Sequence, residues 1–211
     1  MLRLVLIGPP ASGKGTQAEV LTKCLSVPKI STGDMLRAAR ANATELGKSA
    51  ESFMNSGLLV PDSIVIGLVE ERIALPDAQA GFILDGFPRT VPQAEALQEL
   101  LGRVGTPLDA VVQIDVAREL LVERATLRRM DSRTGQIYHL KYNPPPAGVE
   151  VVHREDDREE TVKKRLDEYD TMTAALIPFY SALGLLRRVE GTGAPESVTE
   201  RLMTAIGKLT Q

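Results

Sequence analysis

The chain has 211 residues, with 25 Lys and Arg, 28 Asp and Glu, and a formal net charge of −3 at pH 7. This length suits one domain with a sizeable core, and a near-balanced charge without a basic arm argues against nucleic acid as the main partner. The single cysteine, Cys24, excludes an internal disulfide and a cysteine-based zinc site, and we expect it to be a small packing residue. No apolar stretch approaches membrane-spanning length, and the first predicted strand leaves no room for a targeting segment before it.

Short apolar runs alternate with helical patterns along most of the chain. The strand-like runs cover residues 2–7, 81–84, 110–116 and 185–189, and the helical patterns cover residues 15–25, 63–74, 92–101, 118–129, 159–183 and 195–209. This alternation predicts an α/β fold, a parallel sheet with helices on both faces, whose ligands bind at the carboxyl ends of the strands.

Two segments depart from the alternation. Residues 31–60 carry only helical patterns, and residues 130–153 carry short hairpin signals, with a turn at Thr134-Gly135. Long insertions above the site of an α/β fold are often mobile lids, so we expect both segments to lie beside the sheet as excursions from it.

The segment GPPASGKGT at residues 8–16 joins the first strand to a helical pattern. Glycines let backbone N–H groups turn toward a phosphate chain, and a helix N-terminus adds partial positive charge. Lys14 suits the β- and γ-phosphates of a nucleoside triphosphate, although Gly15 separates it from the threonine, Thr16, that usually follows the lysine directly. The strand–loop–helix context favours a phosphate-binding loop over an ordinary glycine-rich turn with a surface lysine.

The segment GFILDGFPR at residues 81–89 places Asp85 at the end of a strand and Arg89 after Pro88. Alone, Asp85 reads as a turn cap, but beside a phosphate-binding loop its carboxylate suits Mg²⁺ held through water. An arginine on a turn stiffened by proline suits bidentate phosphate binding, and a solvated surface arginine is the alternative.

Two more segments carry arginines. At residues 31–37, a helix cap explains Ser31 and Asp34 but does not require Arg37. Arg124 and Arg128 are four residues apart, so we expect them to share a helix face, where they either bind an anion or flank a solvated helix.

Residues 154–165 read REDDREETVKKR, which is dense in charge. If this stretch is helical, Arg154, Arg158, Thr161 and Arg165 share one face. A salt-bridged, solvated face and a role of Asp156-Asp157 in orienting cations are both compatible with the pattern.

Together these segments resemble the adenylate kinases of the long-lid type. The resemblance spans essentially the whole chain, in family order, through the segments GPPASGKGTQ (8–17), STGDMLRAA (31–39), GFILDGFPRT (81–90), RATLRR (124–129), GQIYHLKYNPP (135–145) and REDDREETVKKRLDEY (154–169). It implies a P-loop kinase core that transfers the γ-phosphoryl group of Mg·ATP to AMP and gives two ADP. It also implies a core domain (residues 1–30, 61–124 and 159–211), a helical AMP-binding domain (31–60) and a small β-rich lid (125–158).

The resemblance also implies roles for single residues. The implied ATP-binding residues are Ala11, Ser12, Gly13, Lys14, Gly15, Thr16, Arg124, Arg128, Ile137, Tyr138 and Gly193. The implied AMP-binding residues are Thr32, Arg37, Leu58, Leu59, Val60, Gly86, Phe87, Pro88, Arg89, Gln93, Arg154 and Arg165. The implied catalytic residues are Lys14, Arg89, Arg128, Arg154, Arg165, Asp156 and Asp157, with Asp85 holding Mg²⁺ through water and Thr16 serving it indirectly.

Three features depart from the usual family pattern. Ala11 stands where the family usually has a second loop glycine, and we expect it to restrict the backbone. The lid lacks the four cysteines that bind structural zinc in some members, so with Asp131 and Thr134 in that region we expect a metal-free lid held by polar contacts. The segment between Pro146 and His153 is shorter than in many long-lid members.

The resemblance implies Mg²⁺ with ATP as the cofactor and ATP, AMP and ADP as partners, with no nucleic-acid or membrane partner. It further implies a monomer in the cytoplasm, or in an organelle if a targeting segment has been removed. Two alternatives stay open. One is a nucleoside monophosphate kinase of another base preference, GTP:AMP or UMP/CMP, and the other is a nucleotide-binding module that has lost catalysis.

Overall fold

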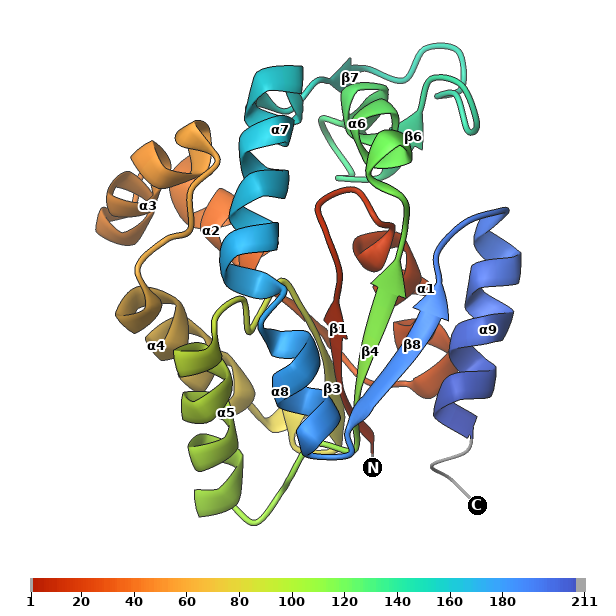
Figure 1. Cartoon of the computed structure of the whole chain (residues 1–211). Helices are drawn as coiled ribbons and strands as arrows, with labels where there is room; N and C mark the ends of the chain where they lie inside the picture. The colour runs from red at the N-terminus through yellow and green to blue at the C-terminus, as the bar shows by residue number, and fades with distance from the viewer. Residues whose placement is uncertain (1, 208–211) are drawn as a thin grey trace.

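The computed structural model describes residues 2–207 and shows an α/β architecture around one parallel sheet (Figure 1). The strand order is β2-β3-β1-β4-β8, and every neighbouring pair is parallel. These strands are β1 (Leu2–Ile7), β2 (Lys29–Ser31), β3 (Gly81–Asp85), β4 (Ala110–Asp115) and β8 (Leu186–Glu190). The predicted fold class is confirmed.

Helices cover both faces of this sheet (Figure 1). The α-helices are α1 (Lys14–Leu25), α2 (Thr32–Ala41), α3 (Glu45–Ser56), α4 (Asp62–Ile73), α5 (Val91–Arg103), α6 (Arg118–Thr126), α7 (Glu159–Glu168), α8 (Leu176–Ala182) and α9 (Pro195–Gly207). Shorter helical turns are η1 (Pro76–Ala78), η2 (Glu155–Asp157) and η3 (Tyr169–Thr173). None of the helices in residues 2–207 has the length and apolar character needed to cross a membrane.

The alternation of side chains along β1 shows how the two faces are buried. Val5 and Ile7 pack into an apolar cluster with α4, α5 and α8, whereas Leu4 and Leu6 pack into a second cluster with α1, α6, α7 and α9. A strand buried on both faces reads as a continuous apolar run, and β1 does so because helices cover it on each side.

The strand register brings three carboxyl ends to one edge of the sheet. Leu6 of β1 pairs with Asp85 of β3 and with Val112 of β4, and Ser31 of β2 pairs with the same Asp85. The loop that follows β1 therefore starts beside Asp85 and beside the N-terminus of α2. In a parallel sheet this edge is where ligands bind.

A second, antiparallel sheet has the order β6-β5-β7, with strands β5 (Arg128–Asp131), β6 (Ile137–His139) and β7 (Val151–Val152). The hairpins predicted in this region are confirmed. At the turn, an Oδ1 of buried Asp131 accepts hydrogen bonds from the backbone N–H groups of Arg133 at 2.8 Å and Thr134 at 3.3 Å. The predicted polar contacts of the lid region are therefore present.

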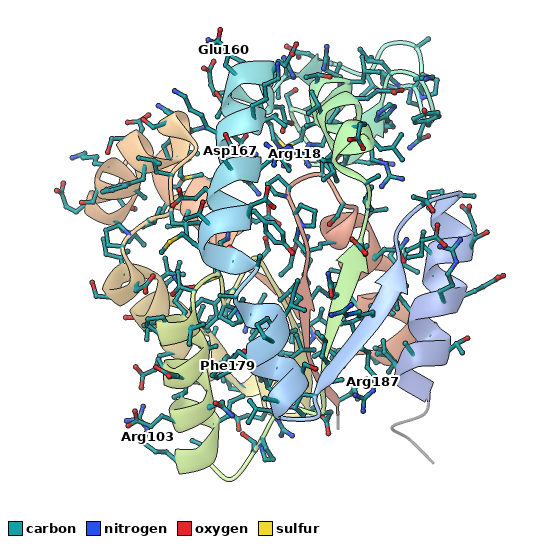
Figure 2. All side chains as sticks on the ribbon, in the orientation of Figure 1. Arg103, Arg118, Glu160, Asp167, Phe179 and Arg187 are labelled. Atoms are coloured by element: carbon teal, nitrogen blue, oxygen red, sulfur yellow. The ribbon has the colours of Figure 1, made fainter. Side chains whose placement is uncertain are left out.

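Charged side chains connect α6, which leads into this second sheet, to α7, which leads out of it. Arg118 of α6 contacts Asp167 and Asp170 at 2.5 Å each, and Figure 2 shows Arg118 and Asp167 facing one another. All three side chains are exposed, so each pair contributes less than about 1 kcal/mol.

The structure corrects the predicted end of one helix. The pattern over residues 118–129 predicted helix to its end, but α6 stops at Thr126 and Arg128 already lies in β5. Arg128 pairs with His139 of β6, so pairing between strands overrides the helical pattern there. The expectation that Arg124 and Arg128 share a helix face is therefore wrong.

The predicted helix over residues 159–183 is also wrong as a single element. It is interrupted by the π-helical turn η3, in which the N–H of Ala174 donates to the carbonyl of Tyr169 at 2.9 Å. Pro178, which has no N–H, lies in the first turn of the α8 helix that follows, where proline is tolerated.

Arg154 and Arg158 precede α7, so the single face expected for them with Thr161 and Arg165 does not form as one helical face. Cys24 is exposed, which contradicts the packing role expected for it.

Two further differences concern β2 and the last helix. The three-residue β2 was not predicted, because it is too short to show an alternating pattern. Residues 208 and 209 of the last predicted helix lie outside the described residues.

Candidate active site

The loop between β1 and α1 wraps around the ammonium group of Lys14. Its Nζ donates to the carbonyl oxygens of Gly8 at 2.6 Å and Pro9 at 2.8 Å, and to the hydroxyl of Ser12 at 3.3 Å. Burial lowers the pKa of Lys14 to about 7, against the opposing charge of Asp85. The charges of Arg89, Arg165 and Arg128 contribute to this lowered pKa, so a nearby anion would favour the charged lysine.

At two positions of this loop the backbone favours glycine, at one because of its φ angle and at the other because a side chain would clash. Ala11 has φ = 63°, a left-handed conformation that costs a non-glycine residue about 1 kcal/mol. A Cβ on Gly8 would lie 2.6 Å from the carbonyl oxygen of Ile114, so only glycine fits where the loop crosses β4. Ala11 therefore occupies a backbone conformation that glycine adopts more readily.

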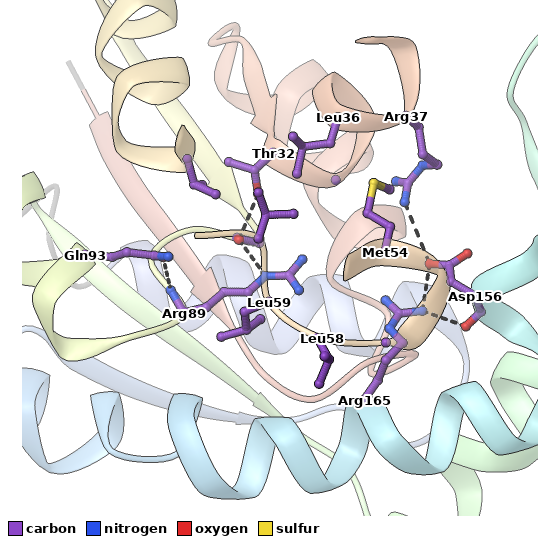
Figure 3. A pocket seen from close by; sticks show the side chains of 15 residues that line it. Thr32, Leu36, Arg37, Met54, Leu58, Leu59, Arg89, Gln93, Asp156 and Arg165 are labelled. Atoms are coloured by element: carbon purple, nitrogen blue, oxygen red, sulfur yellow. Dashed lines mark hydrogen bonds and ion pairs between the residues drawn. The ribbon is translucent and has the colours of Figure 1, made fainter. Parts of the chain in front are cut away.

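A pocket lies at the carboxyl end of β3, between α2, α3, α5 and α7 (Figure 3). One part of its wall is apolar and another carries charged groups, so it can hold a ligand with an apolar ring system and an anionic end. The apolar and uncharged lining residues are Thr32, Gly33, Leu36, Met54, Gly57, Leu58, Leu59, Val60, Val65, Gly86 and Gln93, and the charged ones are Arg37, Arg89, Asp156 and Arg165.

The carbonyl of Gly86, just after β3, organises the floor of this pocket. It accepts hydrogen bonds from the hydroxyl of Thr32 and from Nε of Arg89, both at 2.8 Å (Figure 3). The Phe87–Pro88 peptide bond is cis, and Arg89 follows it. Burial and the charge of Arg165 together lower the pKa of Arg89 to about 10, against the opposing charge of Asp85.

Asp156 connects two arginines across the pocket. Its carboxylate lies 2.8 Å from Nη1 of Arg165 and 4.0 Å from Nη1 of Arg37 (Figure 3). Burial raises the pKa of Asp156, but the charges of Arg165 and Arg37 outweigh this and hold it below its usual value. Arg37 also contacts Asp34 of its own helix at 2.5 Å.

The neighbouring carboxylate, Asp157, is fully buried and holds Arg128 with two hydrogen bonds. The Nε of Arg128 donates to Oδ2 at 2.7 Å, and an Nη donates to Oδ1. Burial lowers the pKa of Arg128, but the hydrogen bond and charge of Asp157 outweigh it and raise the pKa overall. A two-point contact of this kind fixes the plane of the guanidinium.

Arg154 is held less completely. Its Nη2 contacts the sulfur of Met130 at 3.2 Å, and its buried Nε has no hydrogen-bond partner among residues 2–207. Burial and then the charges of Arg37 and Arg128 lower its pKa to about 10. It lies in a second cavity beside the first, which Arg37 and Asp156 also line.

Arg124 lies on the side of the phosphate-binding loop away from the pocket. Both of its Nη atoms donate to the carbonyl of Gly191, at 3.1 Å each, in the loop between β8 and α9. Gly193 has φ = 97° in the same loop, and Arg201 of α9 donates to the carbonyl of Thr192 at 3.0 Å. Arg124 and the loop of residues 191–194 therefore form one surface.

The carboxylate of Asp85 fits an aqueous Mg²⁺. An Oδ2 of Asp85 lies 3.5 Å from the place that a Cβ on Gly15 would occupy, so it faces the start of α1. Among residues 2–207 this carboxylate has no hydrogen-bond or ion-pair partner, and its oxygens suit the waters of a hydrated cation. No group of three or more His, Cys, Asp or Glu side chains within residues 2–207 could hold a metal ion by itself.

Comparison with known proteins agrees with this geometry. The sequence model of the family described as "Adenylate kinase" matches residues 6–185. The chain belongs to the adenylate kinase family. It is 58% identical to an adenylate kinase of Sorangium cellulosum over 97% of this chain and 96% of that protein. It is 49% identical to an adenylate kinase of Carboxydothermus hydrogenoformans and 48% identical to one of Moorella thermoacetica, each over 98% of this chain and over 100% and 99% of the relative.

Membership in the adenylate kinase family confirms the predicted class of enzyme, an ATP:AMP phosphotransferase. It also sets aside the alternative of a nucleotide-binding module without catalysis.

Most of the residues predicted for AMP lie around one pocket in this adenylate kinase, with three exceptions. Phe87 is buried in the hydrophobic core, and neither it nor Pro88 lines the pocket. Arg154 lines the second cavity instead. Of the residues predicted for ATP, Ile137 and Tyr138 lie in β6, and the side chain of Tyr138 is buried.

Sequence reasoning missed three apolar side chains of the pocket, Leu36, Met54 and Val65. Leu36 and Val65 stand at ordinary core positions of helical patterns, so the sequence carries no signal that separates them from core residues. Thr16, predicted to serve Mg²⁺, lies exposed in the first turn of α1.

We predict that Ala11→Gly stabilises the protein by up to about 0.5 kcal/mol, because glycine relieves the left-handed strain while its flexibility in the unfolded chain offsets much of the gain. Urea unfolding measures the change. The control is Ala38→Gly, at an exposed position within α2, which loses about 1 kcal/mol. Equal losses in both variants would contradict the assignment of strain to Ala11.

We predict that Lys14→Met raises the free energy of unfolding at pH 7 in the absence of nucleotide. The folded-state pKa of Lys14, about 7, lies below its ordinary value of 10.5, so folding carries a penalty that is complete below pH 7 and absent above pH 10.5. The advantage of the variant therefore shrinks as pH rises from 7 to 10. Urea unfolding at both ends of this range checks it, with Lys23→Met, an exposed position on the same helix, as control. A pH-independent difference would contradict the prediction.

Proposed function

We propose that this chain catalyses the reversible transfer of the γ-phosphoryl group of Mg·ATP to AMP by holding both nucleotides against one cluster of cations. This cluster of cations consists of Lys14, Arg37, Arg89, Arg128, Arg154 and Arg165. One observation carries the proposal: these cations come together beside one pocket although they belong to different parts of the chain. They come from α1, α2, β5, α7 and the segments after β3 and β7.

The pocket of Figure 3 is proposed as the AMP site. Its apolar wall, including Leu59 and Val60, suits the base, and its charged wall, including Arg37, Arg89 and Arg165, suits the phosphate. Leu58 is half exposed at its rim.

The proposed ATP site runs from the loop of residues 8–16 to the surface formed by Arg124 and the loop of residues 191–194. The backbone N–H groups of this loop and the ammonium group of Lys14 suit the phosphates. Arg124, whose plane is held by the carbonyl of Gly191, suits stacking on the adenine ring. Ile137 and Tyr138 are proposed for the same nucleotide from the lid.

Chemistry in this site requires positioning and charge stabilisation, not a strong base, because the nucleophile is already a phosphate oxygen of AMP. Arg128 is fixed in place by Asp157 and Arg165 by Asp156, so both guanidinium groups are oriented before the charge develops. When bound with ATP, Mg²⁺ would neutralise charge on the phosphates, and Asp85 and Thr16 would hold the ion through its water molecules.

The division into a core, an AMP-binding domain of residues 31–60 and a lid of residues 125–158 is also proposed. Gly57, at the end of α3, lies close to α7, since a Cβ there would be 3.1 Å from the carbonyl oxygen of Thr161 and from Cγ of Arg165. Movement of the lid and of α3 against α7 would close the site to water, which protects ATP from hydrolysis.

We further propose that the enzyme works as a monomer in the cytoplasm, with Mg²⁺ as its only metal. The support is its family and the bacterial origin of the relatives named above. Analytical ultracentrifugation of the purified chain tests the oligomeric state.

We predict that ATP with AMP yields ADP far faster than ATP with UMP or CMP, and faster than GTP with AMP. A coupled assay that varies donor and acceptor separately measures these rates. Comparable rates with UMP or CMP would move the function to a kinase of another base preference. The matched control is Lys14→Ala, which removes the charge at the phosphates and abolishes turnover with every pair while the circular dichroism spectrum stays unchanged.

A further inference from the structure

Behind the AMP pocket, hydrogen bonds connect the pocket residue Gln93 to Asp62 and connect Asp62 to Thr90. Gln93 of α5 lines the pocket, yet it is only 2% exposed. Its Nε2 donates to Oδ1 of Asp62, the first residue of α4, at 2.6 Å. The other carboxylate oxygen of Asp62 accepts from the hydroxyl of Thr90 at 2.9 Å.

The two partners of Gln93 fix the direction of its amide. The backbone N–H of Arg89 donates to Oε1 of Gln93 at 2.7 Å. A carboxylate can only accept hydrogen bonds and a backbone N–H can only donate, so the reversed amide would lose both contacts. Each buried group left without a partner costs about 1 to 3 kcal/mol, which keeps the amide in one orientation.

We propose that Asp62 is a positioning residue that sets the purine specificity of the acceptor site by holding the Gln93 amide in this orientation. The proposal rests on the proposed AMP site. With one N–H bonded to Asp62 and one lone pair used by Arg89, Gln93 retains one N–H and one lone pair for a ligand in the pocket.

The physical reason is the opposite hydrogen-bonding pattern of the two purine types. A 6-aminopurine presents a donor at N6 and an acceptor at N1, whereas a 6-oxopurine presents an acceptor at O6 and a donor at N1. A carboxamide held in one orientation can pair its C=O and N–H with the donor and acceptor of one purine type. The other purine type requires the reversed orientation. A base with the wrong pattern leaves buried polar groups unpaired, which is the strongest form of discrimination between similar ligands.

Asp62 also contributes to the stability of the fold, so the test must distinguish an effect on stability from an effect on purine specificity. Thr90 caps α5 by accepting from the N–H of Gln93 at 3.3 Å, so Asp62 supports the start of that helix as well as its own. A purely structural role predicts loss of stability with no change in the choice between purines.

The experiment compares AMP with IMP, which differs from it by the 6-oxo group and the proton on N1, in wild type, Asp62→Asn and Asp62→Ala. We expect Asp62→Ala to lower the ratio of kcat/KM for AMP to that for IMP at least about tenfold, about 1.4 kcal/mol, mainly through KM for the nucleoside monophosphate. Asp62→Asn, which keeps an oxygen that accepts from Nε2 but also permits the reversed amide, lowers the ratio about threefold. The KM for ATP stays unchanged in both variants.

The matched control is Asp77→Asn, which removes an exposed carboxylate that pairs with Arg72 of α4 at 2.6 Å and leaves the ratio unchanged. A wild-type ratio in the folded Asp62 variants overturns the proposal, and because Asp62→Asn is isosteric, it decides the matter if Asp62→Ala does not fold. Failure of the proposed function looks different, because wild type would then not use AMP at all.

Discussion

The main physical constraint on this structure is that several positive charges, which repel one another, are held together at the carboxyl edge of the sheet. Lys14, Arg89, Arg154 and Arg165 all have pKa values lowered first by burial, with neighbouring cations contributing to each. Without anionic ligands such an arrangement opposes folding, since the buried charges are only partly neutralised. In the proposed function, the phosphates of two nucleotides would supply the missing negative charge, so binding would relieve the cost of holding these cations together.

Carboxylates decide where these cations point without cancelling them. Asp157 holds Arg128 from a fully buried position, and Asp156 holds Arg165 and approaches Arg37. Each carboxylate fixes one edge of a guanidinium, which leaves the remaining N–H groups of that guanidinium for the proposed phosphates. The same principle operates with neutral groups at Gln93, whose amide is fixed from behind by Asp62. Orientation before binding is what a reaction driven by positioning requires.

The sequence predicted the parts of this site that rest on local chemistry. The phosphate-binding loop, Asp85 at a strand end and Arg89 on its turn follow from glycine, charge and strand patterns, and they lie where the pattern indicated. The placement of Arg128 could not be predicted, because only its pairing with His139 of a later strand shows that helix has ended. The interruption of the helix at η3 could not be predicted either, because the apolar residues keep their helical spacing across it. Asp62 escaped notice because its partners, Thr90 and Gln93, are about thirty residues away in the chain.

The central claim, that one cluster of cations is shared by two nucleotides, is tested most directly with an analogue that joins two adenosines through a phosphate chain. Calorimetric titration and thermal unfolding of the wild-type protein give its stoichiometry and its effect on Tm. The account predicts one analogue per chain and a rise in Tm greater than that given by ATP and AMP together at the same concentrations, because the second adenosine binds intramolecularly. Two analogues per chain, or a rise in Tm no greater than that given by ATP alone, would contradict it.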